Sequence, residues 1–319
     1  MTAATLSIDF AGPHVTVQDA GRPGLMRFGV PLSGPMDRLA HAAANIALGN
    51  PPGAPAIEIS RGGLVLHCIS GRVSYAVAGG GFILDHAGQR RGSWTRTTLR
   101  AGETLAIRPG PWGSWCYLAC AGTLKVPHWL GSAATHAASG LGGGHLLAGR
   151  RLTVENPAPL LEDRDIPCPV NARPRHAVRV TIGPQSRFFS AEALSDFLAG
   201  PWRLTDAGDR MGVRLTGPAI APLAIDMQSE PVLRGSVQVA GDGVASVLLA
   251  DHGTTGGYPK IATVLDCDLD AFTRLRPRDP VIFRAISPQD ALAIARTSAE
   301  VNRRYLLNLG RVQGAGAVP

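Results

Sequence analysis

Short apolar segments separated by glycine and proline are the feature of this 319-residue chain that most restricts its fold. Thirty-nine glycines and twenty-five prolines are spread along it, and both residues favour tight turns. Residues 6–10 and 15–18 alternate in polarity around a glycine-proline turn, which is typical of a hairpin. Similar segments follow at residues 64–68, 73–78, 104–107, 115–119, 178–182, 237–239, 246–249 and 281–284. This pattern predicts a mainly β protein with a few helices.

Three helices are predicted from the residues at their starts. Ser and Asp side chains can accept a hydrogen bond from the first turn of a helix, and proline is favoured at the first helical position. The expected ranges and caps are 37–48 with Asp37, 191–198 with Ser190, and 287–302 with Ser287.

A proline-rich segment divides the chain into two parts of similar length. Residues 156–175 carry five prolines and mixed charge, which is typical of a linker. A chain of 319 residues is long for one domain and suits two. We therefore expect one subdomain over residues 1–155 and a second over residues 176–319, with the C-terminal helix in the second.

Charge and cysteine content argue against several classes of function. The formal charge is +7, but the arginines are scattered and aromatic residues make up only 5%, so we expect no nucleic-acid surface. Five cysteines form no CxxC pair, which predicts neither a zinc site nor a disulfide framework. No apolar stretch is long enough to span a membrane, and the N-terminus does not resemble a signal peptide. A cytoplasmic protein without a membrane partner is expected.

Residues 251–260, DHGTTGGYPK, are the strongest candidate for a ligand-binding loop. An apolar strand leads into it, adjacent glycines let backbone N–H groups approach a ligand oxygen, and a lysine supplies a compact cation. The catalytic candidates are Asp251, His252 and Lys260. The substrate-binding candidates of the loop are Thr254, Thr255, Gly256, Gly257 and Tyr258. In the competing interpretation, this is a tight turn whose side chains satisfy backbone groups.

Polar residues elsewhere add further candidates. Substrate-binding roles are predicted for Arg22, Ser33, Asp37, Arg210 and Gln238. The alternative for Asp37 is a helix cap, and for the two arginines it is surface charge. His41 is expected to face solvent. Glu58 lies in an apolar run and needs a partner if it is partly buried. No metal-ligand set is predicted.

Several segments together resemble one protein family. The chain carries, in the order and spacing of that family, TVQDAGRPG, GVPLSGPMDR, NIALGNP with IEIS, DRMGVRL, and SEPVLRGSVQVAGDG followed by LLADHGTTGGYPKIATV. It resembles the biotin-dependent carboxyltransferase family, also called allophanate hydrolase subunit 2 or KipA-like, over roughly residues 15–300. A free-standing chain of this length is most similar to those members that serve as the C subunit of 5-oxoprolinase.

The resemblance implies a fold, partners and an activity. Members have two subdomains with a cyclophilin-like β-barrel architecture, and they pair with a KipI-like second protein, the B subunit. Similarity to 5-oxoprolinase implies a LamB/YcsF-like third protein, the A subunit. It also implies ATP with Mg²⁺ at the complex and opening of the 5-oxoproline lactam to L-glutamate. Two alternatives remain open. One is biotin-dependent carboxyl transfer to urea or a related amide, and the other is a non-catalytic protein that antagonises KipI.

The resemblance also suggests chemical roles within the loop. Asp251 is expected to accept the substrate amide N–H, while residues 254–257 and Lys260 hold the amide oxygen as it gains negative charge. In a 5-oxoprolinase that oxygen is expected to attack the γ-phosphoryl group of ATP. No phosphate-loop motif is present, so the nucleotide is expected at an interface with a partner. Gly253 replaces a glutamine of the family pattern, and Leu32 and Pro35 also depart from it, which leaves the substrate's identity open.

Overall fold

The structure is a computed structural model that describes residues 3–158 and 161–314. The chain forms two compact units. The first contains Met1–Arg22, Ser33–Arg173 and Asn302–Pro319, and the second contains Pro23–Leu32 and Pro174–Val301. The sequence-based boundaries differ from these units at three segments. Residues 23–32 group with the second unit, the expected linker groups with the first unit as far as Arg173, and the chain from Asn302 onward groups with the first.

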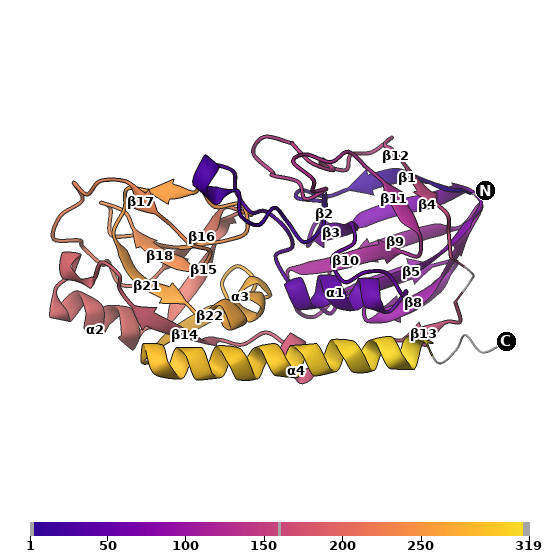
Figure 1. Cartoon of the computed structure of the whole chain (residues 1–319). Coiled ribbons are helices and arrows are strands. Elements are labelled where there is room, and N and C mark those ends of the chain that lie inside the picture. Colours follow the sequence, from indigo (N-terminus) through magenta and orange to yellow (C-terminus); the bar gives the residue numbers. More distant parts are fainter. Residues whose placement is uncertain (1–2, 159–160, 315–319) are drawn as a thin grey trace. The chain divides into compact units, whose positions relative to one another are not determined.

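Two antiparallel sheets build the first unit (Figure 1). The seven-stranded sheet runs in the order β11 (Thr123–Lys125), β12 (Arg151–Glu155), β1 (Ala4–Ala11), β4 (Leu64–Ser70), β9 (Thr104–Arg108), β6 (Ile83–His86), β7 (Gln89–Gly92). The six-stranded sheet runs in the order β13 (Arg164–Asp165), β8 (Thr95–Arg100), β5 (Arg72–Ala78), β10 (Trp115–Cys120), β3 (Ala56–Ser60), β2 (Thr16–Gln18).

The main core of this unit lies between the two sheets. Alternate residues of a strand point to opposite faces of its sheet, and the inward residues here are aliphatic. Leu66 of β4 and Ile107 of β9 meet Val73 and Val77 of β5 in one buried cluster. Because Leu66 and Ile107 are fully buried, truncating either of them to alanine costs about 2–5 kcal/mol.

A second, alanine-rich layer covers the other face of the six-stranded sheet. Helix α1 (Arg38–Ile46) packs there against Ala76 and Ala78 of β5 and Ala119 of β10. Small side chains let the helix backbone approach the sheet closely. All six residues of β10 are buried, as expected for a strand covered on both faces.

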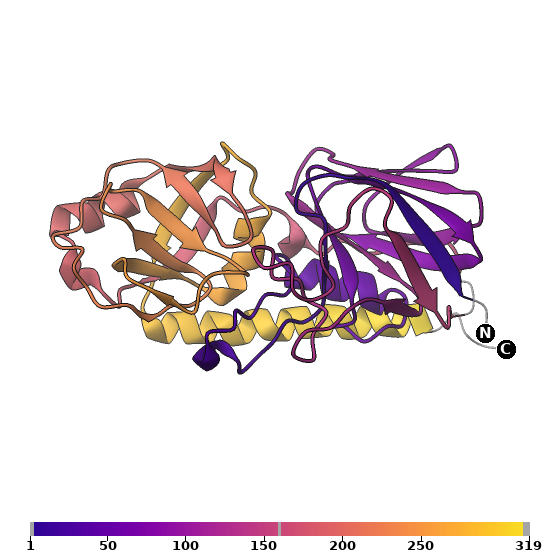
Figure 2. The same ribbon diagram turned by 90° about the horizontal axis from the view of Figure 1, so that it is seen from above.

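A closed barrel forms the second unit, with α2 (Ala191–Ala199) packed against β22 (Figures 1 and 2). The strands follow the order β14 (Ala177–Ile182), β21 (Lys260–Val264), β18 (Ser236–Val239), β19 (Ala245–Leu248), β16 (Gly212–Thr216), β15 (Trp202–Gly208), β22 (Pro280–Ala285). Only β14 and β22 pair in parallel. A separate two-stranded sheet joins β17 (Glu230–Pro231) to β20 (Thr255–Gly256). The predicted mainly β fold with a barrel and two subdomains is confirmed.

The observed helices agree with the predicted starts more closely than with the predicted ends. Asp37 and Ser190 each accept a hydrogen bond from the first turn of their helix, at 3.1 Å in both cases. Helix α4 (Pro288–Gly314) begins after Ser287 as expected, but it extends well beyond the predicted end at residue 302. Helix α3 (Asp266–Thr273) was not predicted. The described residues also form three short 3-10 helices: η1 (Met26–Phe28), η2 (Val170–Ala172) and η3 (Ser186–Phe188).

Candidate functional site

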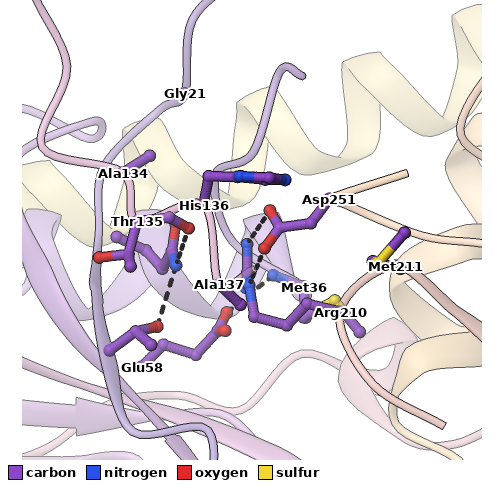
Figure 3. Close-up of polar contacts among 12 residues, drawn as sticks. Gly21, Met36, Glu58, Ala134, Thr135, His136, Ala137, Arg210, Met211 and Asp251 are labelled. Carbon is purple, nitrogen blue, oxygen red and sulfur yellow. Dashed lines mark hydrogen bonds and ion pairs between the residues drawn. The ribbon is translucent and has the colours of Figure 1, made fainter. Parts of the chain in front are cut away.

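The candidate loop begins with a buried ion pair. Asp251 follows the end of β19, and its backbone N–H donates to the Arg210 carbonyl oxygen at 2.7 Å. The Arg210 guanidinium donates to both oxygens of the Asp251 carboxylate, from Nε at 3.0 Å and from Nη2 at 2.9 Å (Figure 3). Both side chains are fully buried. Surface charge is therefore the wrong interpretation of Arg210, which instead anchors the start of the loop.

Lys260, at the other end of the loop, is a buried cation without a hydrogen bond. It is the first residue of β21 and is only 3% exposed. Among the residues that the structure describes, its Nζ atom has no hydrogen-bond partner. A Glu230 carboxylate oxygen lies 3.6 Å away, beyond hydrogen-bonding distance. A buried polar group left unsatisfied costs about 1–3 kcal/mol, so this ammonium group is a donor in need of an acceptor.

Two glutamines fix the surroundings of Lys260. Gln185 accepts the Lys260 backbone N–H at 2.8 Å and donates from Nε2 to the Glu230 carboxylate. Gln238 of β18 lies directly opposite Lys260 in the barrel register. Its Nε2 donates to the Tyr258 carbonyl oxygen at 3.2 Å, whereas its Oε1 has no hydrogen-bond partner among the described residues. The barrel register thus pairs Lys260 with a glutamine whose Oε1 accepts no hydrogen bond from the described residues.

Gly256 leaves room for the Gln238 side chain to approach the loop closely. A Cβ atom at position 256 would lie 2.5 Å from Gln238 Nε2 and 3.1 Å from a Val232 methyl carbon. The pairing of Gly256 with Glu230 brings strand β20 against this site. By contrast, a Cβ atom at Gly253 would meet only the Thr255 carbonyl oxygen, at an ordinary 3.4 Å.

His252 is buried next to the ion pair and is held in its neutral form. Its Nδ1 lies 2.6 Å from the Gly253 carbonyl oxygen, so this nitrogen carries the hydrogen and donates. Burial lowers the pKa of His252, and the nearby Arg234 charge lowers it further. The neutral ring presents Nε2 as an acceptor.

The remaining loop candidates present side chains or backbone at the surface. Tyr258 and Thr255 are exposed, and Thr254 and Gly257 are half-buried. Neither threonine hydroxyl makes a hydrogen bond within the described part of the chain, so both are available as donors. The Thr254 carbonyl oxygen accepts from the Val232 backbone N–H at 3.2 Å, which ties the loop to the segment after β17.

Arg22, Ser33 and Asp37, predicted to bind substrate, all lie in the first unit. Arg22 is buried, stacks on Trp129 with 4.8 Å to the ring centroid, and donates to the carbonyl oxygens of Trp129 and Ala134. Surface charge is therefore wrong for this arginine also. Asp37 caps α1. The buried Ser33 hydroxyl has no hydrogen-bond partner among the described residues.

A buried polar network that the sequence did not reveal surrounds the cap of α1. Glu58 accepts hydrogen bonds from the Tyr117 hydroxyl and from the Met36 backbone N–H, both at 2.8 Å. Burial raises the pKa of Tyr117 well above its ordinary value, and the Glu58 charge adds to this rise. His41 is buried rather than solvent-facing, because its ring packs edge-on against Tyr117 and its Nε2 lies 3.2 Å from the Gln18 carbonyl oxygen. Its pKa is lowered to about 4 by burial.

Possible metal ligands and cysteines are dispersed among the described residues. Within residues 3–158 and 161–314 no group of three or more His, Cys, Asp or Glu side chains could hold a metal ion. None of the five cysteines forms a disulfide, and Cys68, Cys116 and Cys120 are buried. No described helix is both long and apolar enough to cross a membrane.

Known proteins resemble this chain over most of its length. The family described as carboxyltransferase domain, subdomain A and B, matches residues 28–285. The 5-oxoprolinase C subunit of Haemophilus influenzae is 32% identical over 94% of this chain and 96% of its own length. The protein of the same name from Escherichia coli is 32% identical over 90% and 93%. The urea amidolyase of Saccharomyces cerevisiae is 28% identical, but this chain covers only 17% of it.

Solved structures show the same fold within longer chains. The urea amidolyase of K. lactis has a TM-score of 0.84 and 26% identity, over 94% of this chain and 20% of that one. The protein TTHA0988 has a TM-score of 0.80 and 35% identity, over 88% of this chain and 56% of that one. This chain therefore spans about half the length of TTHA0988 and a fifth of the amidolyase.

Proposed function

This chain belongs to the carboxyltransferase domain family, subdomains A and B, and we propose that it is the C subunit of an ATP-dependent 5-oxoprolinase. In this role it contributes to opening the lactam ring of 5-oxoproline to L-glutamate. Both the sequence identity to known C subunits and the matching chain length support this proposal. The two relatives named as the C subunit of 5-oxoprolinase match this chain over more than nine-tenths of their own length, whereas the urea amidolyase match is one part of a much longer protein.

The observation that carries the proposal is the buried Lys260 ammonium group without a hydrogen bond. A lactam is a planar –NH–C(=O)– group, and its oxygen gains negative charge when the ring carbon is activated. Lys260 is the donor for that oxygen, because a cation already removed from water stabilises developing charge strongly. The free Oε1 of Gln238, opposite Lys260 in the register, is the matching acceptor for the lactam N–H.

This assignment changes the role first predicted for Asp251. Both of its oxygens already accept from Arg210, so we assign the N–H contact to Gln238 and a positioning role to Asp251. His252, neutral because burial lowers its pKa, supplies an acceptor nitrogen near the loop. The exposed Tyr258 and Thr255 form the rim over which a substrate or a partner protein approaches.

Mg²⁺ and ATP are expected to bind at the assembled complex. We assign no residue of this chain to the metal ion, since no carboxylate cluster occurs among the described residues, and we derive no step through it. ATP supplies the phosphoryl group that activates the lactam oxygen. The two 5-oxoprolinase relatives are themselves named as subunits, which fits a site completed by KipI-like and LamB/YcsF-like partners. We expect the chain alone to be inactive.

Reconstitution tests this proposal. The chain is co-expressed with KipI-like and LamB/YcsF-like proteins from the same genome, and glutamate release from 5-oxoproline is measured with and without ATP. We expect activity only in the full complex, a loss of at least about a hundredfold in Lys260→Met, and wild-type activity in Lys125→Met. A complete complex without activity, or an active Lys260→Met complex, contradicts the proposal.

Biotin-dependent carboxyl transfer is the second candidate, favoured by the structural match to the K. lactis urea amidolyase. The same preparations are therefore assayed for consumption of carboxybiotin with urea. Turnover there and none with 5-oxoproline selects carboxyl transfer. A stable complex with the KipI-like protein that turns over neither substrate selects the antagonist.

A further inference from the structure

A guanidinium group lies inside the alanine-rich layer of the first unit. Arg96 of β8 points to the same face of the sheet as α1, and its side chain is only 3% exposed. Figure 1 shows α1 and the C-terminal part of α4 on this side of the sheet, and Leu309 of α4 belongs to the same apolar cluster. A charge in such a layer needs compensation, because burial without a partner is costly.

Backbone oxygens satisfy only part of this guanidinium. Nε donates to the Glu162 carbonyl oxygen at 3.1 Å, and Nη1 donates to the Ala47 carbonyl oxygen at 3.0 Å. No carboxylate lies within salt-bridge distance of Arg96 in the described part of the chain. Burial lowers the pKa of Arg96 and the neighbouring Arg164 charge lowers it further, while the Glu162 carboxylate raises it from beyond salt-bridge distance. The Arg96 charge therefore has no carboxylate in contact with it.

The third nitrogen of Arg96 borders open space. Nη2 makes no hydrogen bond to a described residue, and it is accessible to solvent. Arg96 lines a cavity of about 310 Å³. The other lining residues are Ile46, Leu48, Gly49, Asn50, Leu161 and Gly310. This volume is at the lower end of the range for small-molecule sites.

We propose that this cavity binds a small monocarboxylate with a short aliphatic chain. The carboxylate accepts from Arg96 Nη2 and neutralises the buried charge, which makes the hydrogen bond a strong one. The aliphatic tail packs on Ile46, Leu48 and Leu161. A single cation with three aliphatic walls suits one negative charge, whereas a phosphate or a dicarboxylate would bury a second charge without a partner.

The competing interpretation is that Arg96 serves only the fold. Ala47 is the C-cap of α1, and a cation near the carbonyl end of a helix is stabilising. That role accounts for the bond from Nη1, but it requires neither an open Nη2 nor a cavity beside it. The two interpretations separate in a binding measurement, because only the first predicts saturable binding.

Gly310 offers a variant that fills the cavity and leaves Arg96 intact. Its Cβ position meets only an Ile46 methyl carbon, at 3.6 Å, which is an ordinary contact. Leucine is also a far better helix former than glycine, so Gly310→Leu is expected to fold. Arg96→Met removes the charge at similar length. Arg72→Met, an exposed arginine on β5 in the same sheet, is the matched control.

Binding of ¹³C-labelled butyrate to the full-length chain is followed by NMR and by calorimetry, with butylammonium as the charge-reversed probe. We expect saturable binding of butyrate at one site, no binding of butylammonium, and affinity lowered about tenfold or more in both Gly310→Leu and Arg96→Met. Arg72→Met is expected to bind as wild type.

The inference is overturned if butyrate shows no saturable binding to the wild-type chain, or if a folded Gly310→Leu binds it as wild type does. The isolated chain is sufficient for this test, and no turnover is measured. Its outcome is therefore independent of the proposed 5-oxoprolinase function.

Discussion

The buried ammonium group of Lys260 leads to an unusual expectation for stability. Replacing Lys260 with methionine keeps an unbranched chain of similar length and removes a donor that has no hydrogen bond. Relief of an unsatisfied buried group is worth about 1–3 kcal/mol. The lost attraction to Glu230, whose side chain is 45% exposed and 3.6 Å away, is worth about 0–1 kcal/mol. The net effect is a chain that is more stable by about 1 kcal/mol and yet inactive in the complex.

Urea unfolding followed by tryptophan fluorescence measures this change. Trp202 is fully buried in the barrel and reports on the second unit. The matched control is Lys125→Met, which removes the only other lysine of the chain. Lys125 is exposed in its contact with Glu155, so its replacement is expected to change the free energy of unfolding by less than about 0.5 kcal/mol.

A loss of stability in Lys260→Met would refute the reasoning. If the free energy of unfolding of the variant is about 1 kcal/mol lower than that of wild type, the ammonium group stabilises the fold itself. Its lack of a hydrogen bond would then not mark a ligand site. A stabilised variant that keeps full activity would refute the catalytic role while leaving the account of burial intact.

Three further predictions concern the anchor of the loop, acid stability and the packing of the site. Asp251→Asn removes a buried carboxylate that accepts from two Arg210 nitrogens and is expected to cost about 3–5 kcal/mol in urea unfolding; a cost below about 1 kcal/mol contradicts it. The pKa of His41 is about 4 in the folded state, below the ordinary 6.5 of the unfolded state. Protonation of the unfolded state therefore lowers the free energy of unfolding as the pH falls from 6.5 to 4, by at most about 3 kcal/mol, with no loss above pH 6.5. His41→Gln should show a smaller fall over that interval, and an equal fall refutes the assignment. Gly256→Ala places a carbon 2.5 Å from Gln238 Nε2 and is expected to lower glutamate formation about tenfold or more at unchanged stability; wild-type turnover would show that the amide need not stay in place.

Local signals in the sequence predicted the helix starts and the position of the loop. A cap acts within one turn, so Asp37 and Ser190 reveal their helices directly. Helix α3 carries no side-chain cap hydrogen bond, and its Asp268 is instead tied to Arg179. Its formation therefore depends on a residue far away in the sequence. The end of α4 was missed for a similar reason, since Leu309 is buried in the layer beneath α1.

Long-range contacts also explain what was missed at the site. The sequence identified Asp251 and Lys260 but could not show that Arg210, 41 residues before Asp251, occupies both carboxylate oxygens. Gln185 lies 75 residues from Lys260 and carries no motif. Its role comes from the pairing of β14 with β21. Residue types indicate which chemistry is possible, whereas the barrel register decides which atoms remain available.

The backbone at Gly253 has a consequence for how this protein can change over evolution. The position has no left-handed φ, and a side chain there meets no close neighbour. At Gly256, a few residues away, a side chain would displace the Gln238 amide. One end of the loop can therefore exchange a glutamine for a glycine without repacking the barrel, while a side chain at the other end would move Gln238. Changes in substrate range can accumulate at Gly253 at little cost to folding, so relatives with different substrates should diverge there before they diverge at Gly256.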